Sequence, residues 1–239
     1  MRKTKVDRYA EREVIYSPLH WNILREKRNL ATEVLEYLAS NGITGYIFGS
    51  IARGDIHKHS DIEIIVPKHD LLSYVNIILS NKFNVVEIEI TQATPKTAMK
   101  LTFHLGNNVD VVIPVVPLTE LEHEFYRYGG IIGLPDAKNY KKRVPGVDKR
   151  LCIILPTEAG HIEYSILGRE SEVAKILGVT TGIIEERKRM LLKRDAIGRT
   201  GVFINIKLDP TENIYRIIKE LKDKNPIVRR LFREREVDI

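Results

Sequence analysis

The stretch that decides the fold is YIFGSIARG, residues 46–54, followed by SDIEIIV, residues 60–66. Its apolar start predicts a buried strand that runs straight into Gly49 and Ser50. Glycine permits a sharp turn and a close approach of the backbone to a ligand. A helix that begins near Ile51 would also point free backbone N–H groups at an anion. The stretch therefore predicts a turn that can hold phosphate.

Two acidic residues follow this turn at a spacing that suits metal binding. Asp61 and Glu63 lie two residues apart in a strand-like segment, so both side chains are expected on one face. Their Cα atoms would be roughly 6.6 Å apart, at about 3.3 Å of rise per residue, which allows two metal ions about 3.5–4 Å apart between the carboxylates. The alternative is the solvated side of an amphipathic strand, as in Glu87-Ile88-Glu89, which has no glycine turn. Taken alone, the acidic pair favours this surface interpretation.

Taken together, the two features match a known pattern. Gly49-Ser50, ten residues and then Asp61-Ile62-Glu63 resemble the signature of the polymerase β-type nucleotidyltransferase superfamily. The similarity is closest to its minimal members, in which Gly-Ser-x-Ala-Arg-Gly is typical. It covers about residues 45–116, and Glu63 stands where the family more often has Asp.

The family pattern contains a third carboxylate in a later apolar strand. Asp110, within residues 109–113, matches it, and an acid in such a run is costly to bury unless it is paired or bound to metal. Glu87 and Glu89 are the alternatives, and they alternate with apolar residues as a half-exposed strand would. The match favours Asp110.

The resemblance implies transfer of a nucleoside monophosphate from an NTP to an acceptor hydroxyl, with release of pyrophosphate. Gly49 and Ser50 would grip the triphosphate, while Arg53 would pair with a phosphate oxygen or with Asp55. Two Mg²⁺ ions, or Mn²⁺ in their place, suit all-oxygen ligands. The catalytic and metal-binding residues implied are Asp61, Glu63 and Asp110.

Other chemistries remain open beside this one. His57 and His59 lie close to the acids and suggest Zn²⁺ or Mn²⁺, but no further Cys/His spacing supports a zinc site. A different class of function is a catalytically silent nucleotidyltransferase fold that regulates DNA or RNA through its C-terminal domain. The intact Gly49-Ser50 turn and its acids favour an enzyme. The acceptor is open between nucleic acid, protein and small molecule.

The chain as a whole predicts an α+β fold with two domains. Residues 1–135 are expected to form a nucleotidyltransferase-like mixed sheet with packed helices, the first of which starts at Ser17-Pro18 and ends at Asn41-Gly42. Residues 101–105 and 109–115 flank a Gly-Asn-Asn turn and predict a hairpin.

Residues 136–239 are expected to form a smaller, mostly helical domain that resembles a winged helix-turn-helix. It carries 23 basic and 16 acidic residues, against 15 and 16 in the first part, which suggests a module that faces nucleic acid. Helices are predicted around Gly178, with a wing in residues 198–208 and a last helix before a charged tail at Pro226. A plain packing or dimerisation domain is the alternative. The candidate nucleic-acid-binding residues are Arg187, Lys188, Arg189, Lys193 and Arg194.

The composition narrows the setting of the protein. The chain has 239 residues, a net charge of +6 and one cysteine, Cys152, which excludes an internal disulfide framework and suits a reducing compartment. Apolar neighbours mark Cys152 as a core residue. No apolar run is long enough to span a bilayer and no signal peptide is evident, so a cytoplasmic protein without a membrane partner is expected. The abundance of Lys, Arg, Glu and Ile, with Gln92 as the only glutamine, resembles thermophile proteins.

Overall fold

The computed structural model describes residues 6–8, 10–198 and 201–237. The protein is α+β with mixed and antiparallel sheets, as the sequence predicts. Two compact units each combine two separate stretches of the chain: unit 1 is Met1–Ile64 with His123–Thr200, and unit 2 is Ile65–Glu122 with Gly201–Ile239. The domain boundary expected between residues 135 and 136 falls within unit 1. Each unit therefore contains residues from both predicted domains.

The first helix of unit 1 has the start and end that its sequence predicts. Helix α1 (Pro18–Ser40) is capped by Ser17, whose side chain accepts a hydrogen bond from the backbone N–H of His20 at 3.2 Å. Asn41 ends the helix. One face buries a row of side chains at helical spacing: Leu24, Arg28, Ala31, Val34, Leu35 and Leu38.

The short elements around Gly49 also form as predicted. Strand β2 (Tyr46–Phe48) leads into helix α2 (Ser50–Arg53), and strand β3 (Ile62–Ile65) follows after a loop. Gly49 has a φ of 77°, in the region that favours glycine, so the sharp turn depends on this residue. Helix α4 (Glu120–Gly129) leads to strand β7 (Ile131–Gly133), which pairs antiparallel with β2, and to helix α5 (Leu134–Ala137).

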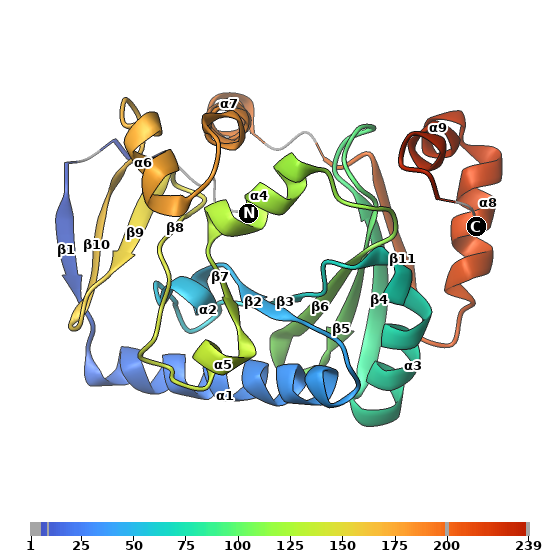
Figure 1. The fold of residues 1–239 in the computed structure, drawn as a ribbon, viewed down its shortest axis with the longest axis horizontal. Helices are drawn as coiled ribbons and strands as arrows, with labels where there is room; N and C mark the ends of the chain where they lie inside the picture. The colour runs from blue at the N-terminus through green and yellow to red at the C-terminus, as the bar shows by residue number, and fades with distance from the viewer. Residues whose placement is uncertain (1–5, 9, 199–200, 238–239) are drawn as a thin grey trace. The chain divides into compact units, whose positions relative to one another are not determined.

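Unit 1 contains a second sheet that the sequence pattern did not predict. Its antiparallel strands β1 (Arg12–Ile15), β10 (Gly160–Ser165), β9 (Cys152–Pro156) and β8 (Gly146–Val147) lie side by side in that order (Figure 1). Gly160 is required at the β1 edge, because a Cβ there would lie 1.8 Å from the carbonyl oxygen of Val14. Residues 136–239 thus contain more strand than the mostly helical domain that we expected.

The two predicted helices around Gly178 are present. Helix α6 (Glu170–Leu177) ends at Gly178, which has a φ of 61°, and helix α7 (Thr181–Ile197) follows. Buried side chains on both helices hold the pair together: Val173, Ala174, Ile183 and Ile184. Only the helix-turn-helix pair is shown; its contact with nucleic acid stays a prediction.

The predicted wing strand belongs to unit 2 instead. Strand β11 (Ile204–Leu208) pairs antiparallel with β4 (Val85–Gln92), which continues through β5 (Lys100–Leu105) to β6 (Val109–Pro114). The wing prediction is therefore wrong for this strand, and residues 199–200 of its tip lie outside the described part. The predicted hairpin between β5 and β6 is confirmed, with its turn at Gly106–Asn108.

Unit 2 is completed by three helices. Helix α3 (Leu72–Lys82) precedes β4, and helices α8 (Ile214–Lys224) and α9 (Pro226–Glu234) follow β11. The charged tail expected after Pro226 is in fact a helix, because Asn225 caps it and proline is tolerated in its first turn. No helix within the described residues has the length and apolarity needed to cross a membrane.

Candidate functional site

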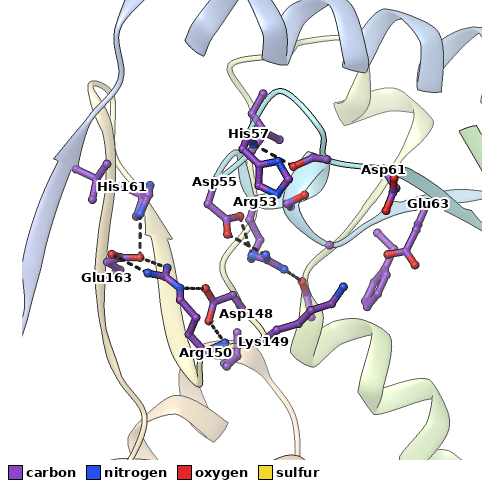
Figure 2. Close-up of a pocket in the computed structure, with 18 of the residues that line it drawn as sticks. Arg53, Asp55, His57, Asp61, Glu63, Asp148, Lys149, Arg150, His161 and Glu163 are labelled. Atoms are coloured by element: carbon purple, nitrogen blue, oxygen red, sulfur yellow. Dashed lines mark hydrogen bonds and ion pairs between the residues drawn. The ribbon is translucent and has the colours of Figure 1, made fainter. Parts of the chain in front are cut away.

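A pocket of about 610 Å³ in unit 1 gathers the Gly49-Ser50 turn and the acidic pair. Gly49, Ser50, Asp61 and Glu63 all line it. Figure 2 shows the carboxylates of Asp61 and Glu63 on the same side of the pocket, as expected for alternate residues of an extended segment. Asp61 is exposed and Glu63 is half-buried, so solvent reaches the pair.

A buried arginine holds the short helix that follows the turn. The guanidinium of Arg28 donates to the carbonyl oxygens of Ile51 at 2.8 Å and Ala52 at 3.1 Å. It also donates to the carbonyls of Lys142 and Ala137. Only 1 % of Arg28 is exposed, and burial lowers its pKa to about 10, so that it stays charged at neutral pH. Arg28, on helix α1, thus holds the short helix α2 in place.

The burial of Arg28 was not predicted, but the sequence carries a signal for it. Arg28 lies four residues after Leu24 and three before Ala31, on the apolar face of α1. A charged residue at such a position is rarely buried unless it has partners. The pattern therefore indicates an internal cation, although it does not name the carbonyls that receive its hydrogen bonds.

Arg53 is engaged by protein groups rather than free for a ligand. Its Nε and Nη2 donate to the two carboxylate oxygens of Asp55, each at 2.9 Å, and Nη1 donates to the carbonyl oxygen of Gly129. Its side chain is 7 % exposed. Of the two partners considered for Arg53, the structure shows Asp55. We therefore assign Arg53 to positioning the turn, which lines the same pocket.

His20 supports the loop after the turn. Its Nε2 lies 2.8 Å from the carbonyl oxygen of Gly54, and its ring stacks on Tyr16 with centroids 3.7 Å apart. Burial lowers the pKa of His20. The ring is therefore neutral at pH 7, with its Nε2–H donated to Gly54.

Another wall of the pocket holds a network of paired charges. Glu163 binds Arg12, Arg150 and His161, and Arg150 also donates to Asp148 at 2.6 Å (Figure 2). Burial raises the pKa of Glu163, but hydrogen bonds from His161 and Arg150 outweigh it and hold this pKa well below its usual range. Sequence patterns did not predict this network, because its members come from three distant segments. The alternation of His161 and Glu163 in an otherwise apolar strand was the available signal.

The five predicted nucleic-acid-binding residues of α7 have different surroundings. Arg187 lines the pocket. Lys188 is paired with Glu170 at 2.6 Å and with Glu185 at 2.7 Å. The other three are exposed: Arg189, Lys193 and Arg194. The helix therefore divides its cations between the pocket, ion pairs and the surface.

The third predicted carboxylate, Asp110, belongs to unit 2. It lies on β6 opposite His104 of β5, and His104 Nδ1 is 2.8 Å from Asp110 Oδ1. The alternatives have partners on β11: Glu87 binds Lys207 at 2.7 Å, and Glu89 accepts a hydrogen bond from Asn205 at 2.7 Å. His104 also lies 3.8 Å from Glu89, so cross-strand pairing accounts for all three acids.

The donors near the turn suit a hard cation. The carboxylates of Asp61 and Glu63 and the hydroxyl of Ser50 supply oxygen only, which fits Mg²⁺ better than Zn²⁺. His57 and His59 line the pocket too, but the ring Nδ1 of His57 already accepts the backbone N–H of His59 at 3.2 Å. Within residues 6–8, 10–198 and 201–237, no group of three His, Cys, Asp or Glu is arranged to hold a metal ion.

Cys152 has the character of a core residue. It is buried in β9, and burial raises the pKa of its thiol to about 12. A thiol with such a pKa is not ionised at neutral pH and is a poor nucleophile.

Comparison of the chain with protein-family models, with curated proteins and with solved structures gives no match.

Proposed function

We propose that the protein is a metal-dependent nucleotidyltransferase, which moves a nucleoside monophosphate from an NTP to an acceptor hydroxyl and releases pyrophosphate. One observation carries the proposal: the Gly49-Ser50 turn and the Asp61–Glu63 pair line one pocket. The motif resemblance rests on the same residues. The pocket volume of about 610 Å³ lies in the usual range of ligand sites, about 300–1,000 Å³.

The roles of the residues follow from their chemistry. Ser50 and the backbone of the turn would contact the triphosphate, because the Gly49 conformation lets the chain approach a ligand closely. Asp61 and Glu63 would hold Mg²⁺, which would lower the pKa of the attacking hydroxyl and neutralise charge on the leaving pyrophosphate.

Neighbouring residues of unit 1 serve to keep these groups in place. Arg28, Arg53 and His20 fix the turn and its helix through backbone carbonyls, so little reorganisation is needed when substrate binds. Phosphoryl transfer asks mainly for positioning and charge compensation from the protein. A rigid turn beside two carboxylates supplies both.

The direct test is transfer of label from each α-labelled NTP, with Mg²⁺ and with mixed cellular RNA and protein as acceptors. We expect pyrophosphate release and a labelled product in the wild type, and neither in Asp61→Asn with Glu63→Gln. Glu87→Gln is the matched control, because it neutralises an acid of the same alternating pattern outside the pocket. Equal activity in the double variant and the wild type would refute the proposal.

Exposed cations on α7 support a second, nucleic-acid-binding role, either for an acceptor or for regulation. Arg189, Lys193 and Arg194 are exposed on this helix. We expect nucleic-acid affinity to fall steeply with salt. Neutralising all three should reduce the slope of log affinity against log salt by up to about 2.7 for duplex DNA, at about 0.9 per contact. An unchanged slope would exclude this face.

A further inference from the structure

The cations that line the unit 1 pocket fall into two groups. Arg12, Arg53 and Arg150 each bind a carboxylate. Arg187 and Lys149 line the same pocket, and neither has a carboxylate partner among the residues that the structure describes. An ion pair explains why Arg12, Arg53 and Arg150 lie in the pocket. Among the described residues, no such pair explains the presence of Arg187 and Lys149.

Arg187 is the more informative of the two, because it is largely covered. Its Nε is buried and has no hydrogen-bond partner in the described part of the chain. The guanidinium carbon lies 4.7 Å from the ring centre of Phe125, a contact that supplies only part of what water provides to a cation. Burial lowers the pKa of Arg187, and the negative charge of Glu186 offsets this only in part.

A second group with an unmet hydrogen bond lies in the same pocket. Tyr128 of α4 is 2 % exposed, and its hydroxyl is buried without a partner among the described residues. Burial raises the pKa of Tyr128; the charges of Arg187 and Arg53 oppose this shift and that of Asp148 adds to it, so these three groups lie near the Tyr128 hydroxyl. Buried polar groups in proteins nearly always have a partner. Two unmet donors in one pocket therefore point to an acceptor that binds there.

The two helices that carry these donors are fixed to each other. The buried carboxylate of Glu124 on α4 accepts hydrogen bonds from the backbone N–H and the hydroxyl of Thr180, at 2.9 and 2.6 Å. Thr180 is the N-cap of α7. This contact sets α7 against α4 and holds Arg187 beside Phe125, so its place in the pocket is built into the fold.

Lys149 adds a third donor to this part of the site. Figure 2 shows its side chain extending across the pocket, toward the side on which Glu63 lies. Lys149 is exposed, so its amino group is free to adjust to a ligand. A guanidinium fork, a phenol and an ammonium group together form a donor set with a net positive charge.

We propose that Arg187, Tyr128 and Lys149 form a binding subsite for a phosphate group. Phosphate suits a guanidinium fork, and it accepts several hydrogen bonds at once. Two sources share this chemistry, the triphosphate tail of the NTP and a terminal phosphate of the acceptor. The assignment to either source rests on the proposed function, whereas the anion site itself does not.

The test uses inorganic triphosphate without metal, titrated calorimetrically into the full chain. We expect Arg187→Met to weaken binding at least tenfold and Tyr128→Phe at least threefold. Arg25→Met, at an exposed arginine of α1 outside the pocket, should change it less than twofold. Equal binding by wild type and Arg187→Met would overturn the proposal.

Thermal unfolding separates a ligand role from a structural one. Removing a buried charge that lacks a partner should leave the Tm of Arg187→Met unchanged or raise it. Arg187→Lys keeps the charge without the fork and should restore part of the affinity. A Tm loss of several degrees in Arg187→Met would mean that Arg187 is structural, which also overturns the proposal.

A comparison of ligands identifies the source of the phosphate. If the subsite takes the triphosphate tail, Arg187→Met weakens ATP and inorganic triphosphate but not a 5′-phosphorylated oligonucleotide. The reverse pattern assigns the site to the acceptor. If triphosphate binds in an Arg187-dependent manner and the wild type transfers no nucleotide, the anion site stands while the proposed function fails.

Discussion

Two acidic segments of the same pattern have different surroundings. Asp61-Ile62-Glu63 lines the unit 1 pocket, whereas Glu87-Ile88-Glu89 lies on a strand of unit 2 whose glutamates bind Lys207 and Asn205 of β11. Alternation alone puts two acids on one face in both places. The glycine turn before Asp61 is what distinguishes them, because it lines the same pocket as the two carboxylates.

Basic side chains show a similar contrast between the surroundings of the turn and the surface of unit 2. Arg28 and Arg53 are almost fully buried and hold backbone carbonyls near the turn. Lys207, in contrast, makes a pair in which its own side chain is 65 % exposed. Basic side chains of the same charge thus contribute differently to the stability of the fold, because solvent screens the interactions of the exposed ones.

The largest effect is expected on the rate of nucleotide transfer, when the acids of the two segments are neutralised. Asp61→Asn with Glu63→Gln should lower nucleotide transfer by about 10³-fold or more, since the groups that compensate charge in the transition state are lost. Glu87→Gln with Glu89→Gln should leave the rate within about twofold, because surface pairs contribute little. Initial rates of pyrophosphate release measure both.

Much of this contrast was predictable from local signals. Capping by Ser17, the turn at Gly49 and the helix end at Gly178 are set by a few neighbouring residues, and each was identified from them. The structure places Gly49, Ser50, Asp61 and Glu63 on one pocket. Short-range chemistry fixes such features, whatever the rest of the chain does.

Features that depend on distant pairing were not predictable in the same way. Strand β1 pairs with β10, and the paired residues Arg12 and Glu163 are 151 positions apart in the sequence. Strand β11 pairs with β4 rather than forming a wing. An alternating pattern predicts that a segment forms a strand, but it does not predict the strand with which that segment pairs. Helix α7 carries cations around its circumference, so the sequence did not show that Arg187 faces the pocket while Arg189 faces solvent.

The next effect concerns stability and the buried guanidinium. Arg28→Met should lower the free energy of unfolding by about 4 kcal/mol, because several buried carbonyls lose their donor. Arg25→Met is the control on the same helix, since Arg25 is exposed and donates only to the hydroxyl of Tyr140. Urea denaturation measures both variants. A loss below about 1 kcal/mol for Arg28→Met would show that these hydrogen bonds do not support the turn.

A smaller loss is expected when the charge network is broken. Arg150→Met leaves Asp148 and Glu163 with fewer counter-charges and should cost about 1–3 kcal/mol, discounted because Arg150 is partly exposed. Lys207→Met should cost less than about 1 kcal/mol. If urea denaturation gives similar losses in the free energy of unfolding for the two variants, ion pairs in the pocket contribute no more to stability than those on the surface.

The smallest effect is a pH dependence at His20. Burial lowers the pKa of His20, so the unfolded chain takes up a proton that the folded protein does not. Stability from the neutral ring is complete above the unfolded pKa of about 6.5 and is lost as pH falls below it. Between pH 7.5 and 5.5, wild type should lose up to about 1 kcal/mol more than His20→Asn. Exposed His123→Asn, followed by the same denaturation, should behave as wild type does.

The most direct single measurement is calorimetric titration of ATP with and without Mg²⁺, in wild type and in Asp61→Asn with Glu63→Gln. We predict that Mg²⁺ strengthens ATP binding to the wild type and that the double variant loses this Mg²⁺ dependence while it still binds inorganic triphosphate. No ATP binding by the wild type, or an equal response to Mg²⁺ in both proteins, would contradict a nucleotide and metal site at the Gly49-Ser50 turn.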